Sequence, residues 1–187
     1  RIFSCALVSL AAASFAAPGF AQTATPLRVL THSSFDLPKD LLAQFEKEAG
    51  ARLQIVKAGD AGEMTNKLIL TKAKPIADVV YGIDNTLLPR ALAAGVIEAY
   101  TGPAAQRTAA VAMEGGVVPV DFGYVTLNID KGWFAKKGLA LPASLEDLTK
   151  PAYAKLLVVQ NPATSSPGQA FVFATIAGLG EEGAFKW

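Results

Sequence analysis

Cysteine and histidine are nearly absent from this sequence of 187 residues, which contains one of each. Zinc sites built from His and Cys need several such ligands, so a site of that kind is excluded within this sequence. A catalytic Ser-His-Asp triad would have to use His32, the single histidine. The sequence also has no Gly-x-Ser-x-Gly motif and no Walker phosphate-binding loop. It therefore offers few of the residues from which active sites are built.

An excess of either charge is missing as well, since Lys and Arg number 17 and Asp and Glu number 16. Proteins that bind nucleic acid normally carry a basic excess or a basic stripe, and neither is visible here. Hydrophobic residues make up 51% of the chain, enough for one sizeable core and the start of a second. We therefore expect a globular protein without a nucleic-acid partner.

Residues 1–21 have the pattern of a secretory signal peptide. Arg1 precedes an apolar stretch over residues 2–17, and small residues stand at the −3 and −1 positions of a cleavage site after Ala21. This stretch is shorter than the roughly 20 residues that a membrane-spanning helix needs. Cleavage would remove the only cysteine, which suits an exported protein. The chain starts without Met and stops where a helical pattern is beginning, so we interpret it as a fragment.

Short apolar runs alternate with helical patterns from residue 27 onward. The runs predict strands at residues 27–31, 53–55, 77–81 and 156–159. The helical patterns predict helices at residues 38–49, 60–73 and 85–94, one capped at Ser144 with Asp147 at its third position, and one from about residue 168. Strands that alternate with helices in this way are typical of a parallel α/β sheet with helices on its faces.

Two stretches need a separate interpretation. Residues 117–129 form a long extended run that Pro119 and Gly123 interrupt, which suits a segment crossing from one lobe to another. Residues 178–183 match the pattern G-x-G-x-x-G, but they follow a helix, whereas the dinucleotide-binding fingerprint follows a strand. We interpret them as a helix terminus and a loop.

Polar residues follow the predicted strands at their carboxyl ends. Ligands of open α/β sheets bind outside these ends, where helix N-termini point their N–H groups outward. Four loops therefore direct hydrogen-bonding groups to one edge, and these groups are His32, Ser33, Ser34, Asp60, Asp84, Asn85, Thr164, Ser165 and Ser166.

Each of these residues also has a purely structural interpretation. Asp60 and Glu63 have the spacing of a capping box, and Asp84 is suited to a cap or an Asx turn. Either Ser165 or Ser166 can cap the helix that follows. His32 can be a polar group at the protein surface. Tyr124 is more often a core residue than a ligand contact, although it can present its ring to a cleft.

Four stretches in this order resemble the thiamine-binding periplasmic proteins of ABC importers. The resemblance covers residues 27–168 and rests on LRVLTHSSFDLP, ADVVYGIDNTLLPRA, VPVDFGYVTLNIDK and VVQNPATSSPG. It implies a two-lobe α/β periplasmic binding protein of type II with mostly parallel sheets flanked by helices. The first lobe would span residues 22–118. Residues 119–187 would form the crossing strand and the start of a second, incomplete lobe.

The resemblance also implies roles for single residues. His32 occupies the position of a ring that lies against the vitamin, which is tyrosine in the relatives. Asp60 would face the cationic thiazolium or the aminopyrimidine, and Ser165, with Ser166 beside it, would meet the hydroxyl or phosphate end. Asp84 and Asn85 would shape the cleft, and Tyr124 is a further candidate contact.

The implied function is non-enzymatic: a monomeric periplasmic protein, without a cofactor, would bind thiamine or its phosphates and deliver them to a membrane permease. Two alternatives stay open at this point. The same fold binds ferric iron, polyamines or other small solutes in other proteins, although the paired tyrosines common in iron sites are missing from the sequence. An exported α/β enzyme would use His32 as its general base, but no defined nucleophile accompanies it.

Overall fold

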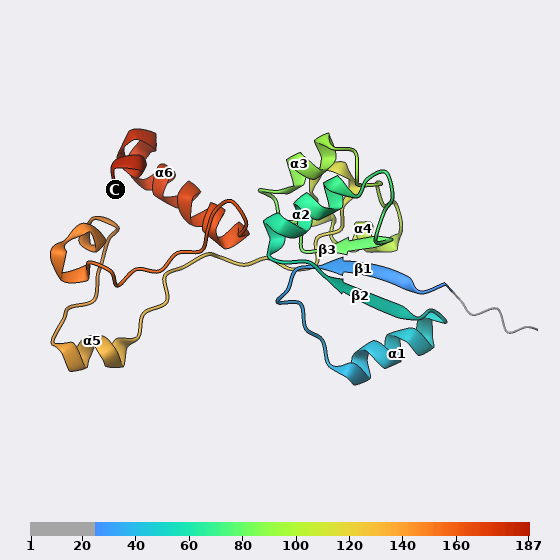
Figure 1. The fold of residues 1–187 in the computed structure, drawn as a ribbon, viewed down its shortest axis with the longest axis horizontal. Coiled ribbons are helices and arrows are strands. Elements are labelled where there is room, and N and C mark those ends of the chain that lie inside the picture. The colour runs from blue at the N-terminus through green and yellow to red at the C-terminus, as the bar shows by residue number, and fades with distance from the viewer. Residues whose placement is uncertain (1–24) are drawn as a thin grey trace, which may run out of the picture.

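The computed structural model describes residues 25–187, so the predicted signal peptide lies outside the described residues. Figure 1 shows two groups of elements joined by an extended segment. The first group contains a three-stranded sheet, and the second consists of helices and extended segments. Within the described residues no helix is both long enough and apolar enough to cross a membrane.

The sheet has the strand order β2-β1-β3, and both pairings are parallel. Its strands are β1 (Leu27–Thr31), β2 (Leu53–Lys57) and β3 (Val79–Tyr81). The helices α1 (Lys39–Ala49) and α2 (Ala61–Leu70) follow β1 and β2 in the chain. This arrangement confirms the predicted parallel α/β fold, in which each crossover carries a helix.

The ends of the first helices follow local sequence chemistry. Pro38 stands before α1, and Gly50 ends it with a φ of 62°, a left-handed conformation that glycine adopts without a steric cost. Asp60 caps α2, because its Oδ1 accepts a hydrogen bond from the backbone N–H of Ala61 at 2.8 Å. Both helices were predicted, although α2 ends about three residues earlier than expected.

Two predictions for this part of the chain are wrong in detail. The helix expected at residues 85–94 is α3 (Leu88–Ala93), and it begins later because Asp84 Oδ1 binds the N–H groups of Thr86 and Leu87 in a turn. The buried strand expected at residues 77–81 is the three-residue β3, and 46% of Val79 is exposed. β3 lies at an edge of the sheet, which explains this exposure.

The core of the first group lies between the sheet and α2. Leu30 of β1 and Met64 of α2 are fully buried, and Ala58 is nearly so. The partly buried side chains that pack against these three are Val56, Leu68, Ile76, Ala77, Val80 and Ile83. This apolar contact anchors α2, and with it the loops at the carboxyl edge of the sheet.

At the amino-terminal end of β1, an exposed ion pair joins Arg28 of this strand to Asp78, which immediately precedes β3. Arg28 Nη2 lies 2.8 Å from Asp78 Oδ1, and hydrogen bonds from the Arg28 side chain and N–H hold the pKa of Asp78 below its usual range. A lowered folded-state pKa contributes stability above the unfolded-state pKa, and this contribution is lost as pH falls through the folded value.

We therefore expect Asp78→Asn to lower the melting temperature at neutral pH. The difference from the unsubstituted protein should begin to shrink as the pH falls below about 4, the unfolded-state pKa of an aspartate, and continue to shrink toward the lower folded-state pKa. Thermal melts between pH 3 and pH 7 measure this, with Asp36→Asn as the control because Asp36 forms no ion pair within the described chain. A difference independent of pH would contradict the prediction.

The remaining helical elements include short turns and one long helix. The alanine-rich stretch after α3 forms α4 (Pro103–Arg107), η1 (Ala109–Val111) and η2 (Glu114–Gly116). The second group contains α5 (Lys131–Lys137), η3 (Glu146–Thr149), η4 (Pro151–Tyr153) and α6 (Ser166–Lys186).

The predicted cap is present, since Ser144 and Asp147 bind each other's backbone N–H groups, but the helix that follows is a 3₁₀ turn. The loop expected at residues 178–183 is instead a break at Gly180, after which α6 continues.

The two extended runs in the second half of the chain form no strands. Residues 117–129 cross between the groups without pairing, and the strand predicted at residues 156–159 is extended but unpaired. A strand is completed by hydrogen bonds from a neighbour, and no described residue supplies them. The side chains of Phe122 and Val158 are accordingly 85% and 90% exposed.

A cavity of about 460 Å³ lies between these runs, α5 and α6. Its lining is mostly apolar and includes Leu127, Trp133, Phe134, Tyr153, Leu156 and Phe171. The side chain of Asp130, the one charged residue of the lining, caps α5 by accepting a hydrogen bond from the N–H of Trp133. Such a lining is typical of the core of a lobe, so we do not place the candidate ligand site in this cavity.

Candidate ligand-binding site

Two helix N-termini meet where the two groups of elements touch. The N–H of Gly62, in the first turn of α2, donates a hydrogen bond to the carbonyl of Thr164 at 2.8 Å. Thr164 lies just before α6, whose N-terminal end approaches α2 in Figure 1. Asp60 precedes α2 and Ser165 precedes α6, so the loops that carry them face one another. We call this contact region the seam. It also includes the loop after β1, the loop after β3, and Asp121 of the crossing segment.

Ser165 is the most unusual residue of the seam. It is only 3% exposed, and its Oγ has no hydrogen-bond partner among the described residues. It occupies the N-cap position of α6, but its side chain makes no cap hydrogen bond. A buried hydroxyl without a partner costs free energy, so such a group in a native structure points to a missing partner. Ser166, the first residue of α6, is partly exposed.

Asp60 and Asp84 both serve local structure. Asp60 caps α2 as described, which confirms the capping interpretation. Asp84 uses one oxygen to accept from the N–H and hydroxyl of Thr86 and from the N–H of Leu87. The Thr86 hydroxyl also lies 2.9 Å from the side-chain oxygen of Gln169 in α6. Asp84 thus positions a second link across the seam, while the neighbouring Asn85 is exposed.

His32 lies at the same edge, next to aromatic residues that sequence reasoning missed. Its ring packs on the backbone of Gly82, where a Cβ atom would stand 2.6 Å from His32 Cδ2. The ring centroid of Tyr81 is 6.0 Å from that of His32 and 5.3 Å from that of Phe35. Tyr81 is the last residue of β3, so its position at a strand end was a signal available in the sequence.

Tyr124 is not brought to this site by any described contact. It lies on the crossing segment with 88% of its surface exposed, and its ring neighbour is Phe122 at 6.4 Å. The structure thus assembles His32, Asp60 and Ser165 on loops that border the seam, whereas Tyr124 stands apart.

The seam carries negative charge. The carboxylates of Asp60, Asp84 and Asp121 form no ion pair with Lys or Arg within residues 25–187. Asp121 Oδ2 accepts a hydrogen bond from the Tyr81 hydroxyl at 3.2 Å, and burial, followed by this bond, raises the pKa of Tyr81. Such a surface favours a cation, whereas the free N–H groups at the start of α6 favour an oxygen-bearing group. In the described part of the chain, no three metal-ligating side chains cluster.

Comparisons with known proteins place the chain in a family. A family model described as bacterial extracellular solute-binding protein matches residues 74–187. The thiamine-binding periplasmic protein of Brucella abortus is 29% identical over 197 aligned positions, which cover 100% of this chain and 56% of the relative. The protein of that name from Escherichia coli is 31% identical over 180 positions, covering 91% of this chain and 52% of the relative.

A solved structure supports the fold. The periplasmic binding protein P5PA matches with a TM-score of 0.68 at 21% sequence identity, over 86% of this chain and 53% of that chain. The chain spans about half the length of the curated relatives that it matches. Solute-binding proteins bind and release their ligands and are not enzymes. Since the family model covers more than half of the sequence, the chain belongs to the bacterial extracellular solute-binding proteins.

Proposed function

We propose that this protein is the periplasmic solute-binding component of an ABC importer, that it binds thiamine or a thiamine phosphate between its lobes, and that it delivers the vitamin to a membrane permease. Relatives named as thiamine-binding periplasmic proteins support this ligand. The proposal includes export by the N-terminal signal peptide and action as a monomer. It also places the boundary of the first lobe between residues 118 and 119.

The observation that carries the proposal is the buried, unpartnered hydroxyl of Ser165 at the start of α6. Thiamine has a hydroxyl at one end, and its esters have a phosphate there. Either group supplies the hydrogen bond that Ser165 lacks, and the N-terminal end of α6 stabilises a negative charge. Asp60, across the seam, supplies a carboxylate for the cationic part of the vitamin. In this arrangement Ser166 lies beside the hydroxyl or phosphate end of the vitamin, and His32 lies beside its cationic part.

Closure of the two lobes around the ligand is the mechanism that this geometry supports. The hydrogen bonds from Gly62 to Thr164 and between Thr86 and Gln169 join the lobes across the seam. Opening the seam would break both bonds and expose Ser165 to solvent. A ligand that contacts both lobes stabilises the closed state relative to the open one, so binding shifts the population toward closure.

Isothermal titration of the complete mature protein with thiamine and with thiamine monophosphate tests the proposal. We expect saturable binding of at least one of them, together with a higher melting temperature, because a ligand at 100 times its Kd stabilises the folded state by about 2.7 kcal/mol. Spermidine, a polyamine, and ferric citrate, a source of ferric iron, serve as comparison ligands for the two alternative solute classes. The absence of both heat and a thermal shift with the two thiamine compounds would refute the vitamin assignment.

A further inference from the structure

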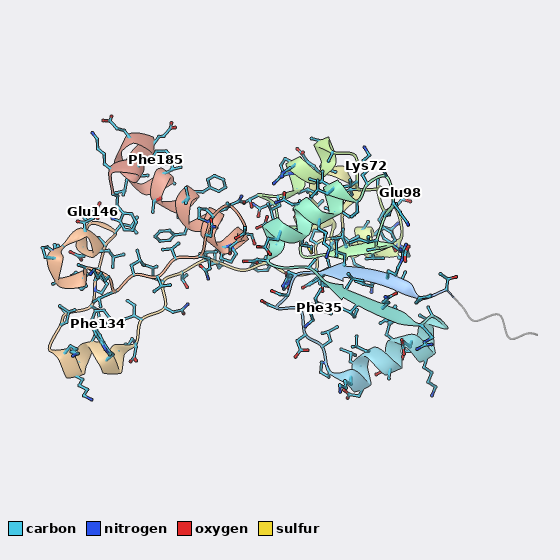
Figure 2. The ribbon with its side chains drawn as sticks, viewed as in Figure 1. Phe35, Lys72, Glu98, Phe134, Glu146 and Phe185 are labelled. Atoms are coloured by element: carbon cyan, nitrogen blue, oxygen red, sulfur yellow. The ribbon has the colours of Figure 1, made fainter. Side chains whose placement is uncertain are left out.

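Tyr81 and Phe35 form an aromatic cluster with His32 at the ends of two neighbouring strands, and neither of them has a role in the function proposed above. β1 and β3 are paired in parallel with Thr31 opposite Tyr81, so the residues that follow them emerge at the same edge. The ring of Tyr81 is flanked there by His32 and by Phe35, which lies in the loop after β1. Figure 2 shows Phe35 at that loop, close to where the crossing segment reaches the sheet.

Backbone geometry holds this cluster in place. Gly82 has a φ of 107°, a conformation that favours glycine, and its missing side chain leaves room for the ring of His32. The N–H of Phe35 donates to the carbonyl of His32 at 3.2 Å, and Phe35 meets Tyr81 edge to face at 64°. Tyr81 is therefore buttressed by two aromatic neighbours on the loop after β1 and not by its own strand alone.

Tyr81 also meets a carboxylate from the crossing segment. Its hydroxyl donates to Asp121, which is exposed and forms no ion pair within residues 25–187. An aromatic face attracts organic cations through its quadrupole, and a carboxylate at its hydroxyl adds to this attraction. A ring and an unpaired carboxylate at one edge form the recognition pair that a flat cation requires.

We propose that Tyr81 is a specificity-determining residue of the seam: its ring is the face against which the cationic heterocycle of the ligand stacks, with Asp121 as the accompanying carboxylate. This inference rests on the proposed function and refines it. In this arrangement β3 and the crossing segment supply the groups that bind the cation, in addition to the carboxylate of Asp60. The short imidazole of His32 then borders the stacked heterocycle and does not carry it.

Titration of thiamine into Tyr81→Leu and Tyr81→Phe in the complete protein tests the inference. Leucine removes the aromatic face and keeps apolar bulk, so we expect about five- to thirtyfold weaker binding. Phenylalanine keeps the face and loses only the bond to Asp121, so the loss should be about two- to threefold. Adding His32→Tyr to Tyr81→Leu should restore part of the affinity, because a larger ring then stands at the neighbouring strand end. His32→Tyr alone is the reference for this rescue: its gain in affinity should be larger in the Tyr81→Leu background than in the unsubstituted protein, and equal gains would contradict the inference.

The matched control is Tyr100→Leu, a half-exposed tyrosine between α3 and α4, which should bind thiamine as the unsubstituted protein does. Melting curves without ligand identify any variant that fails to fold. In that event Asp121→Asn, a change at an exposed side chain, carries the test with an expected loss of about threefold. If the unsubstituted protein binds thiamine and Tyr81→Leu binds it within twofold, the inference is wrong while the proposed function stands. If the unsubstituted protein does not bind thiamine, the proposed function itself fails.

Discussion

Replacing Ser165 with alanine is expected to weaken ligand binding and, at the same time, to stabilise the ligand-free protein. The buried Oγ has no partner among the described residues, so its removal abolishes a desolvation penalty of about 1–3 kcal/mol. The same change deletes the hydrogen bond to the ligand, which should weaken binding by about tenfold. Urea denaturation measures the first effect and isothermal titration measures the second.

Ser144→Ala is the matched control, because Ser144 is also a serine at the start of a helical turn. Its hydroxyl accepts from the N–H of Asp147 at 3.3 Å, and its side chain is exposed. Losing a satisfied cap should lower stability by roughly 0.5–1 kcal/mol and leave affinity unchanged. An affinity within twofold of the unsubstituted protein in Ser165→Ala would show that the hydroxyl does not contact the ligand.

The second large effect is expected from Gly62→Ala, which should hinder closure of the seam. A Cβ atom at Gly62 would stand 2.7 Å from the carbonyl oxygen of Thr164 and 3.0 Å from its Cα. These are backbone atoms, so they cannot rotate away as a flexible side chain does. The added methyl group would push the loop before α6 away and break the hydrogen bond from the Gly62 N–H. We expect ligand affinity to fall by at least about tenfold, the equivalent of roughly 1.4 kcal/mol.

Alanine favours helix over glycine by about 0.8–1 kcal/mol, so α2 itself should not be weakened by this change. Small-angle X-ray scattering with and without ligand would report the failure to close as a larger radius of gyration. Gly178→Ala in α6 is the control, because the nearest atom to its added Cβ is a leucine methyl group at 3.8 Å. Equal affinity in Gly62→Ala and Gly178→Ala would contradict a closure contact at Gly62.

The first half of the fold was largely predictable because its signals are local. Gly50 stops α1 and Asp60 starts α2 through single backbone conformations or hydrogen bonds. The alternation of strands and helices then sufficed for a parallel sheet. The errors arose where a neighbour decides the outcome, since the turn at Asp84 delays α3 and the edge position exposes Val79.

The second half was less predictable because more of its structure depends on neighbouring segments than on local signals. Residues 156–159 are apolar and β-prone, but propensity alone does not form a strand without a paired neighbour. The break at Gly180 likewise depends on one backbone angle, a φ of 72°, within an otherwise helical run. The resemblance to the solute-binding proteins was readable because whole motifs, and not single residues, carried it.

The sequence by itself determined the parallel α/β class, the loops that carry His32, Asp60 and Ser165, and the family, because each depends on residue order along the chain. Only the tertiary structure showed that Ser165 is buried without a partner, that Gly62 touches Thr164, and that Tyr81 joins His32, Phe35 and Asp121. These facts join segments that lie between about 40 and 100 residues apart, and burial and hydrogen-bond pairing arise only when such segments meet.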